Sequence, residues 1–408
     1  MKQHTDGDWI FTIEDKQAVI AGYQGRGHRV LLVPSKLGGR QVTRIGARAF
    51  AGHYEIDYVI LPENIIEIGD KAFERCGLKN LKIPKAIRKV GVNPFWLCKS
   101  LNAIQVEAGN TCFESMDGVL YGCDGEDHRT LICYPMGKRD RTFAIPERVS
   151  IIGEYAFYGC LHLEEVTLRD DVIDVEPEAF EGCSQLEKVQ LSQNLKTIGQ
   201  EAFAGCWSLK RIIIPGAIVT LEKSAFAGCY GLSDVHFTSP TAFTTYYLSV
   251  LSGCEALENV VLPEGIKTLE IDDSVMNLSP DSRDREVHVH VPRSVETVRL
   301  YEGEYLIGKS VLPCKAGQGY CFHIPKGTRY LWSRRALAQQ NENYYFSDDG
   351  WSHTTRHKRN ARAWSLCEKM SLLGALLQRT KYNHAAVKAA GNVKLKIIEE
   401  DRQDEVQI

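Results

Sequence analysis

The sequence predicts an α/β solenoid, a stack of repeated coils in which each coil holds a short strand and a one-turn helix. Two observations in the 408 residues lead to this fold class. An Ala-Phe pair recurs at intervals of about 23 residues, and an apolar triplet follows it, as Leu163, Val166 and Leu168 follow Phe157. A unit of this length cannot bury its own apolar face, so neighbouring units must stack into a continuous core.

Two columns of residues mark the predicted coils. The last two residues of each apolar triplet alternate as in a strand, and the Ala-Phe segment is the predicted helical turn. The phenylalanines are Phe50, Phe73, Phe157, Phe180, Phe203 and Phe226, with Phe95 in the same column. The cysteines that follow them are Cys76, Cys98, Cys160, Cys183, Cys206 and Cys229, and Cys254 comes one longer stride later.

The repeat pattern divides the first part of the chain into a cap and a solenoid. Residues 1–29 are expected to form N-terminal strands that cap the stack, and residues 30–265 to form the solenoid itself. An insert at about residues 107–142 interrupts the period. Inside it, residues 118–121 and 130–134 flank a turn-rich segment and predict a β-hairpin.

Beyond residue 265 the repeat weakens. Residues 266–331 keep alternating apolar residues but lose Ala-Phe, which predicts irregular terminal coils that close the stack. Residues 332–408 are expected to be a connector followed by a small helical region. Apolar residues spaced three and four apart predict a helix over 361–379, and a second helix is expected within 384–400.

The cysteine column is interpreted as packing. A free cysteine is small and apolar, and a column of such residues lets adjacent coils approach closely. No Cys-x-x-Cys occurs among the 13 cysteines, and His53 occupies the same column in the first full repeat. We therefore expect buried, reduced thiols with a structural role, and no metal or redox ladder.

The repeat resembles a known family. The pattern Ile-Gly-x-x-Ala-Phe-x-Gly-Cys-x-x-Leu-x-x-Val-x-Leu/Ile-Pro, seen from Ile198 to Pro215 with Ile in place of Val, is similar to the BspA-like leucine-rich repeat family. The segments VPSKLGGRQVTRIG and MDGVLYGCDGEDHRTLICYPMGK also resemble parts of those proteins, and the likeness covers roughly residues 30–265. It implies a right-handed leucine-rich repeat stack, mostly bacterial or protozoan relatives, and roles in adhesion and protein binding.

Composition and motifs indicate a non-enzymatic protein without a cofactor. The net charge of −3 gives no general attraction to nucleic acid or to an anionic membrane. No apolar run approaches the roughly 18 residues of a membrane-spanning helix, and the polar N-terminus predicts a cytoplasmic protein. No nucleophile elbow, phosphate-binding loop or zinc-protease helix occurs, and the glycines of GYQGRG (residues 22–27) are interpreted as a turn.

Two groups of possible metal ligands were weighed against simpler interpretations. His288 and His290 share one face of a predicted strand and could share a metal. No Asp, Glu or Cys stands near them at matching spacing, so exposed histidines on an edge strand are favoured. Cys314, Cys321 and His323 have a poor zinc spacing and are interpreted as ordinary loop residues.

Two alternative functions remain open at this stage. Residues 326–363 combine basic and aromatic side chains, which a single-strand nucleic-acid site would use. No RNA-binding motif accompanies them, so a connector that covers the end of the stack is favoured and nucleic acid is not the expected partner. The other alternative is an enzyme whose site lies unrecognised in the C-terminal third.

The favoured function is protein binding by the sheet face that points away from the core. Stacked strands should pair Glu165 with Lys188, and Arg211 with Asp234, across neighbouring coils. Mixed charges and scattered apolar groups suit a protein partner of unknown identity. The candidate contact residues are Tyr58, Lys82, Gln105, Glu165, Thr167, Lys188, Gln190, Arg211, Asp234 and His236. The hairpin is expected to form a wall beside Gln105, Glu165 and Thr167.

Overall fold

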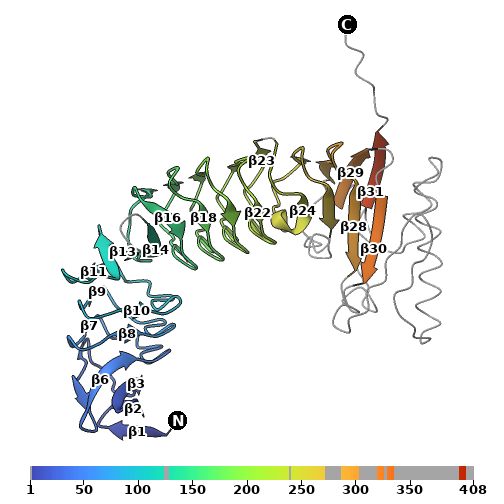
Figure 1. Ribbon diagram of the computed structural model, residues 1–408. Helices are drawn as coiled ribbons and strands as arrows, with labels where there is room; N and C mark the ends of the chain where they lie inside the picture. The colour runs from blue at the N-terminus through green and yellow to red at the C-terminus, as the bar shows by residue number, and fades with distance from the viewer. Residues whose placement is uncertain are drawn as a thin grey trace, which may run out of the picture. The chain divides into compact units, whose positions relative to one another are not determined.

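The structure is a computed structural model that describes residues 2–123, 128–238, 240–271, 286–302, 319–325, 329–334 and 395–400. The chain divides into two compact units, Met1–Leu209 and Lys210–Ile408. The described residues of both units form short strands connected by turns (Figure 1).

Three antiparallel strands begin the first unit, where the sequence predicts N-terminal strands. They are β1 (Gln3–Asp6), β2 (Trp9–Glu14) and β3 (Gln17–Tyr23). Asp15 and Lys16 form the turn between β2 and β3 with φ values of 48° and 64°, as a two-residue hairpin requires. β3 then pairs in parallel with β6 (Arg40–Ile45), so this meander leads directly into the stack.

The coils of the first unit contribute strands to two parallel ladders. The first ladder consists of β4 (Val30–Leu32), β7 (Tyr58–Ile60), β9 (Asn80–Ile83) and β11 (Ala103–Val106). The second ladder runs from β6 to β8 (Glu67–Ile68) and β10 (Lys89–Val90), and β5 (Lys36–Leu37) pairs antiparallel with β6. Along β9, Leu81 and Ile83 are buried whereas Asn80 and Lys82 are exposed. This alternation gives each such strand a core face and an outer face.

The predicted hairpin is present and has a third strand. β12 (Phe113–Met116), β13 (Val119–Cys123) and β14 (Arg129–Cys133) pair antiparallel in sequence order. β14 also pairs in parallel with β16 (Val149–Ile152), so the hairpin starts a new ladder of the stack. That ladder continues through β18 (Asp174–Val175) to β20 (Thr197–Ile198). The companion ladder is β15 (Thr142–Ala144), β17 (Glu165–Thr167) and β19 (Lys188–Gln190).

The second unit contains ladders of the same kind. β21 (Arg211–Ile214) pairs with β23 (Asp234–Phe237), and β22 spans Thr220–Leu221. One later ladder has the order β24 (Thr245–Tyr247), β26 (Thr268–Ile271), β28 (Thr297–Glu302) and β30 (Arg329–Arg334). The other has the order β25 (Asn259–Val261), β27 (Glu286–His290), β29 (Gly319–Pro325) and β31 (Leu395–Glu400).

The predicted one-turn helices are wrong for the described coils, which are connected by turns. Residues before the Ala-Phe pairs have left-handed φ values, 57° at Arg48 and 56° at Glu178, which a right-handed helix excludes. The backbone bonds also run between coils, because the Phe50 amide donates to the Ala72 carbonyl at 2.8 Å. Among the described residues the one helix is the 3₁₀ turn η1, Leu248–Leu251. The chain is therefore a β-solenoid.

The helical C-terminal region is not supported where the structure describes it. The helix predicted at 361–379 lies outside the described residues. The second was expected within 384–400, but Leu395–Glu400 form strand β31. This strand pairs with β29 over six residues, which shows that ladder pairing overrides the local helical pattern there.

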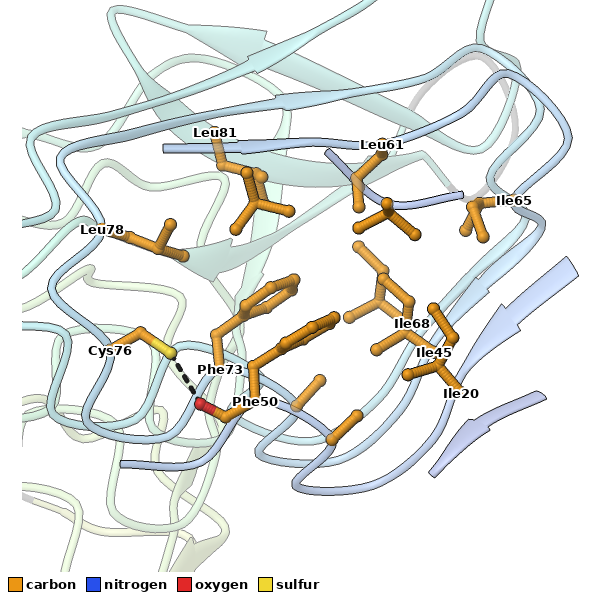
Figure 2. Close-up of a cluster of buried hydrophobic side chains, with 14 of the residues drawn as sticks. Ile20, Ile45, Phe50, Leu61, Ile65, Ile68, Phe73, Cys76, Leu78 and Leu81 are labelled. Carbon is orange, nitrogen blue, oxygen red and sulfur yellow. Dashed lines mark hydrogen bonds between the residues drawn. The ribbon is translucent and has the colours of Figure 1, made fainter. Parts of the chain in front are cut away.

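The phenylalanine column forms the centre of the core. Phe50 and Phe73 stack with ring centroids 5.1 Å apart, and Figure 2 shows the two rings lying against each other. After the insert, Phe157 stacks on Phe180 at 4.6 Å. Tyr134, at the end of the hairpin, stacks on Phe157 at 5.1 Å. Tyr134 therefore provides the column residue that the interrupted repeat lacks.

The cysteine column binds neighbouring coils through hydrogen bonds as well as packing. The Cys76 thiol donates to the Phe50 carbonyl at 2.8 Å (Figure 2), and Cys183 donates to the Phe157 carbonyl at 3.0 Å. His53, in the same column, places Nε2 3.0 Å from the Tyr23 carbonyl. The His53 imidazole thus reaches a backbone carbonyl of the preceding coil, as the cysteine thiols do. This shared partner explains how histidine can replace cysteine at this position.

These thiols should resist chemical labelling in the native protein. The column cysteines are buried, and burial raises the pKa of the Cys98 thiol to about 12. Little thiolate therefore exists at neutral pH for reaction. We expect maleimide to spare Cys160, Cys183, Cys206 and Cys229 until the protein is unfolded, as read by mass spectrometry. A disulfide among these four in the purified protein would contradict the packing role.

A group of glutamates should make the stability of the fold depend on pH. Burial, followed by the adjacent Glu178 and then Glu201, raises the pKa of Glu181 to about 7. The native state then holds a proton that the unfolded chain releases at lower pH, so stability should fall as pH rises through that interval. We expect the melting temperature to fall between pH 5 and 8. The fall should be smaller in Glu181→Gln, whereas the exposed control Glu63→Gln should behave as wild type.

Candidate protein-binding surface

The candidate contact residues all lie on strands, at outer-face positions. In the first unit Tyr58 is on β7, Lys82 on β9 and Gln105 on β11. β17 carries Glu165 and Thr167, and β19 carries Lys188 and Gln190. In the second unit β21 carries Arg211, and β23 carries Asp234 and His236. Glu165 and Thr167 are half-buried, and the others are exposed.

The two predicted ion pairs across neighbouring coils are confirmed. Lys188 Nζ lies 2.5 Å from Glu165 Oε1 in the first unit, and Arg211 Nε lies 2.9 Å from Asp234 Oδ2 in the second. Both pairs are solvent-exposed, so each contributes about 1 kcal/mol or less to stability. Their charges largely neutralise each other on the outer face.

The three residues expected to contribute to the floor of one site do not all occupy neighbouring register positions. The insert adds β15 to the stack, so that Thr142 is the register partner of Glu165 and Ala144 that of Thr167. Gln105 belongs to the separate ladder β4-β7-β9-β11, in which β11 is the terminal strand. The structure therefore does not bring these three residues into register.

An exposed apolar cluster lies on the outer face of β4 and β7. Val30, Leu32, Tyr58 and Ile60 have exposed fractions of 53%, 66%, 41% and 53%. Val30 is the register partner of Tyr58, and Leu32 that of Ile60, on strands about 4.8 Å apart. These four residues form one contiguous cluster, the β4–β7 patch.

Ionised residues lie beside the β4–β7 patch. Directly before the strands, Asp57 accepts hydrogen bonds from Arg29 Nε at 2.8 Å and from Lys79 Nζ at 3.1 Å. The hydrogen bond from Arg29, followed by that from Lys79, lowers the pKa of the Asp57 carboxyl. On the neighbouring coils Lys82 Nζ donates to Glu107 at 2.6 Å and lowers the pKa of that carboxyl. The result is an apolar centre with a charged surround, the usual composition of a protein interface.

Sequence reasoning identified Tyr58 but not the other three members of the patch. Val30 and Leu32 precede the first complete repeat, so the period does not place them beside Tyr58 and Ile60. The alternation of Val30, the 5% exposed Leu31 and Leu32 is the signal that marks β4 as a strand with an apolar outer face.

Other kinds of site find no counterpart in the described part of the chain. Among residues with described side chains, no three His, Cys, Asp or Glu are grouped to hold a metal ion. No described helix has the length and apolarity that crossing a membrane requires.

The stacked parallel coils define a leucine-rich repeat solenoid. A family model described as "BspA type Leucine rich repeat region" matches residues 38–124 and 150–276 in six copies. The matched residues exceed half of the 408. The chain therefore belongs to the BspA-type leucine-rich repeat family.

Three solved structures of bacterial proteins are similar to this chain. A leucine-rich repeat protein from Eubacterium ventriosum is 19% identical, with a TM-score of 0.50 over 66% of this chain and 92% of that one. A leucine rich cell surface protein from Faecalibacterium prausnitzii is 23% identical, with a TM-score of 0.47 over 66% and 95%. The pneumococcal vaccine antigen PcpA is 18% identical, with a TM-score of 0.43 over 75% and 94%. No curated protein matches the chain.

Proposed function

We propose that the chain is a non-enzymatic binding protein whose protein partner docks on the outer face of the β4-β7-β9-β11 ladder. The observation that carries this proposal is the β4–β7 patch, in which four large apolar side chains stand adjacent and exposed. Single exposed apolar residues are common on protein surfaces, but contiguous groups mark interaction sites. A leucine-rich repeat solenoid is a fold typical of protein-interaction and surface proteins.

The surroundings of the patch favour a protein partner over a polyanion. Lys82 is held by Glu107, and Arg29 and Lys79 by Asp57, so the basic groups beside the patch already have acidic partners. Nucleic acid would need uncompensated positive charge. Burying the apolar centre would supply the binding free energy, and the ion pairs around it would orient the partner.

The other candidate residues would make separate and weaker contacts. Glu165 is paired with Lys188 and Arg211 with Asp234, so these groups would favour one orientation of a partner more than they would raise affinity. Thr167, Gln190 and His236 offer hydrogen-bonding groups beside those pairs.

The remaining functional expectations stay predictions. The nucleic-acid alternative rests on residues 326–363, of which only 329–334 are described, as strand β30. An enzymatic site in the C-terminal third would fall largely on residues outside the described ranges. A cytoplasmic location also remains a prediction from the sequence.

Site-specific photo-crosslinking tests the location of binding. A photoreactive amino acid at Leu32 should capture a partner from the native lysate, which is then identified and purified. The matched control carries the same group at Ile173, an exposed apolar residue of the same unit beside β18. The proposal requires that the purified partner crosslink through Leu32 and not through Ile173. Equal crosslinking from both positions, or from Ile173 alone, would contradict the assigned face.

A further inference from the structure

A free strand edge lies at β4 rather than at β27. The exposed edge strand expected for His288 and His290 is wrong, because β27 pairs with β25 on one side and with β29 on the other. β4, in contrast, is the terminal strand of the β4-β7-β9-β11 ladder and pairs with β7. In the described part of the chain no strand lies along the other edge of β4.

The hydrogen bonds to β7 show which backbone groups of β4 face the free edge. The Arg29 carbonyl accepts a hydrogen bond from an amide of β7, and the Val33 amide donates one to the carbonyl at the end of β7, both at 3.0 Å. In a parallel pair, successive residues of one strand alternate between facing the neighbouring strand and facing away from it. The N–H and C=O groups of Leu31 therefore face β7, and those of Val30 and Leu32 face the free edge.

β4 lacks the common protections of an edge strand. Edge strands are usually shielded by a charged side chain, a proline or a bulge, but β4 has the sequence Val-Leu-Leu and pairs with β7 without a register shift. The terminal strand of the other ladder that begins this unit is β1, which has the polar sequence QHTD. At β4, outward backbone groups instead adjoin the exposed apolar side chains of the β4–β7 patch. An extended segment of another protein can pair with such an edge.

The charges near β4 favour an acidic segment over a second copy of this chain. At the start of the strand, Arg29 and Lys79 share the single carboxylate of Asp57, so these three groups carry one net positive charge. Beyond the end of the strand, Lys36 is exposed. Two copies paired antiparallel through β4 would bring Arg29 of one protomer toward Lys36 of its partner, and like charges repel. A segment with one acidic residue is complementary to this end of β4.

We propose that the partner contributes an extended peptide segment that pairs with the free edge of β4, carries apolar side chains at alternate positions and has an acidic residue beside Arg29. This inference rests on the proposed function, because it names the kind of segment that the β4–β7 patch receives. Main-chain hydrogen bonds to an exposed strand edge supply affinity, and the alternate side chains supply specificity. The outward side chains of the added strand would lie about 4.8 Å from Val30 and Leu32 and would extend the apolar cluster.

A library of random linear peptides displayed on phage, selected on the tag-free, full-length chain, provides a probe of this edge. The selected peptides should have apolar residues at alternate positions and an aspartate or glutamate near one end. Replacement of that acidic residue by its amide should weaken binding, as read by fluorescence anisotropy. A selection that enriches no peptide with this pattern would overturn the proposal.

Backbone methylation of a selected peptide separates strand pairing from docking on the outer face alone. In a strand added to β4, every second amide faces β4 and donates to it. N-methylation of those amides should weaken binding at least tenfold, whereas N-methylation of the intervening amides should leave it nearly unchanged. Equal effects of the two sets of methyl groups would contradict main-chain pairing.

A proline variant of β4 makes the same test from the side of this chain. Leu32→Pro removes an outward N–H group, and its matched control Leu32→Ala shortens the same side chain but keeps that group. Proline is tolerated on an edge strand where the N–H faces solvent, so both variants should retain the circular dichroism spectrum of the wild type. The selected peptide and the partner purified through Leu32 should each bind Leu32→Pro at least tenfold more weakly than Leu32→Ala.

The outcomes distinguish failure of this inference from failure of the proposed function. Equal binding of the two variants by a partner that crosslinks through Leu32 would overturn strand pairing and leave the proposed function intact. A partner that does not crosslink through Leu32 would contradict the proposed function and this inference together. If Leu32→Pro does not fold, the methylated peptides still decide the question on the wild-type chain.

Discussion

Replacement of Phe180 by alanine should lower the free energy of unfolding by about 3–5 kcal/mol. Phe180 is fully buried, and its ring stacks on Phe157 at 4.6 Å and on Phe203 at 4.9 Å. The substitution removes the transfer free energy of the ring and leaves a cavity between two flat neighbours. The rings of Phe157 and Phe203 cannot easily move together to close this cavity, because each ring is fixed by its own coil.

Urea unfolding followed by circular dichroism measures this loss. Tyr54→Ala is the matched control, because Tyr54 lies in the first unit with its side chain 69% exposed. It should change stability by about 0.5 kcal/mol or less. Phe180→Leu should fall between the two, since leucine fills part of the cavity. A loss below about 1 kcal/mol for Phe180→Ala would show that the aromatic column is not the centre of the core.

The second large effect is expected at the glycine of the Ile-Gly pair. A Cβ at Gly199 would lie 2.6 Å from the backbone nitrogen of Pro177, on the preceding coil. The same position at Gly69 would bring a Cβ to 2.7 Å from the Ala47 nitrogen. The glycine thus lets two backbones approach more closely than any side chain permits.

Gly199→Ala should therefore destabilise the protein by about 1–3 kcal/mol, the usual cost of overpacking. Backbone atoms cannot rotate away as the end of a side chain can. Gly22→Ala is the control, because its added carbon would lie no closer than 3.4 Å to Ile10. Thermal and urea unfolding of both variants measure the difference. Equal stability of the two would mean that coil spacing does not depend on this glycine.

The core could be predicted from the sequence because it repeats. Phe180 and Cys183 recur at fixed intervals, and both are buried in the predicted columns. The conformation of the Ala-Phe segment was harder to predict, since a helical turn and a non-helical turn can contain the same number of residues. Left-handed residues such as Glu178 and bonds to the next coil decide between them, and a single repeat read by itself does not reveal either.

Most of the surface could not be predicted, because it depends on pairings outside the regular period. Val30 meets Tyr58 through a strand that precedes the first full repeat. Only the register of the folded ladder brings these residues together. The Glu165–Lys188 pair was predictable because both residues occupy the same position in successive regular repeats.

The affinity of a purified partner for patch variants is the decisive measurement of binding at the β4–β7 patch. Leu32→Glu combined with Ile60→Lys places two opposite charges, on register partners that can pair, in the centre of the β4–β7 patch without touching the core. Binding should weaken at least tenfold, about 1.4 kcal/mol, with an unchanged melting temperature. Ile173→Glu, the control at an exposed apolar residue away from this face, should bind as wild type. Normal binding by the double variant would contradict the assignment of function to the outer face of β4 and β7.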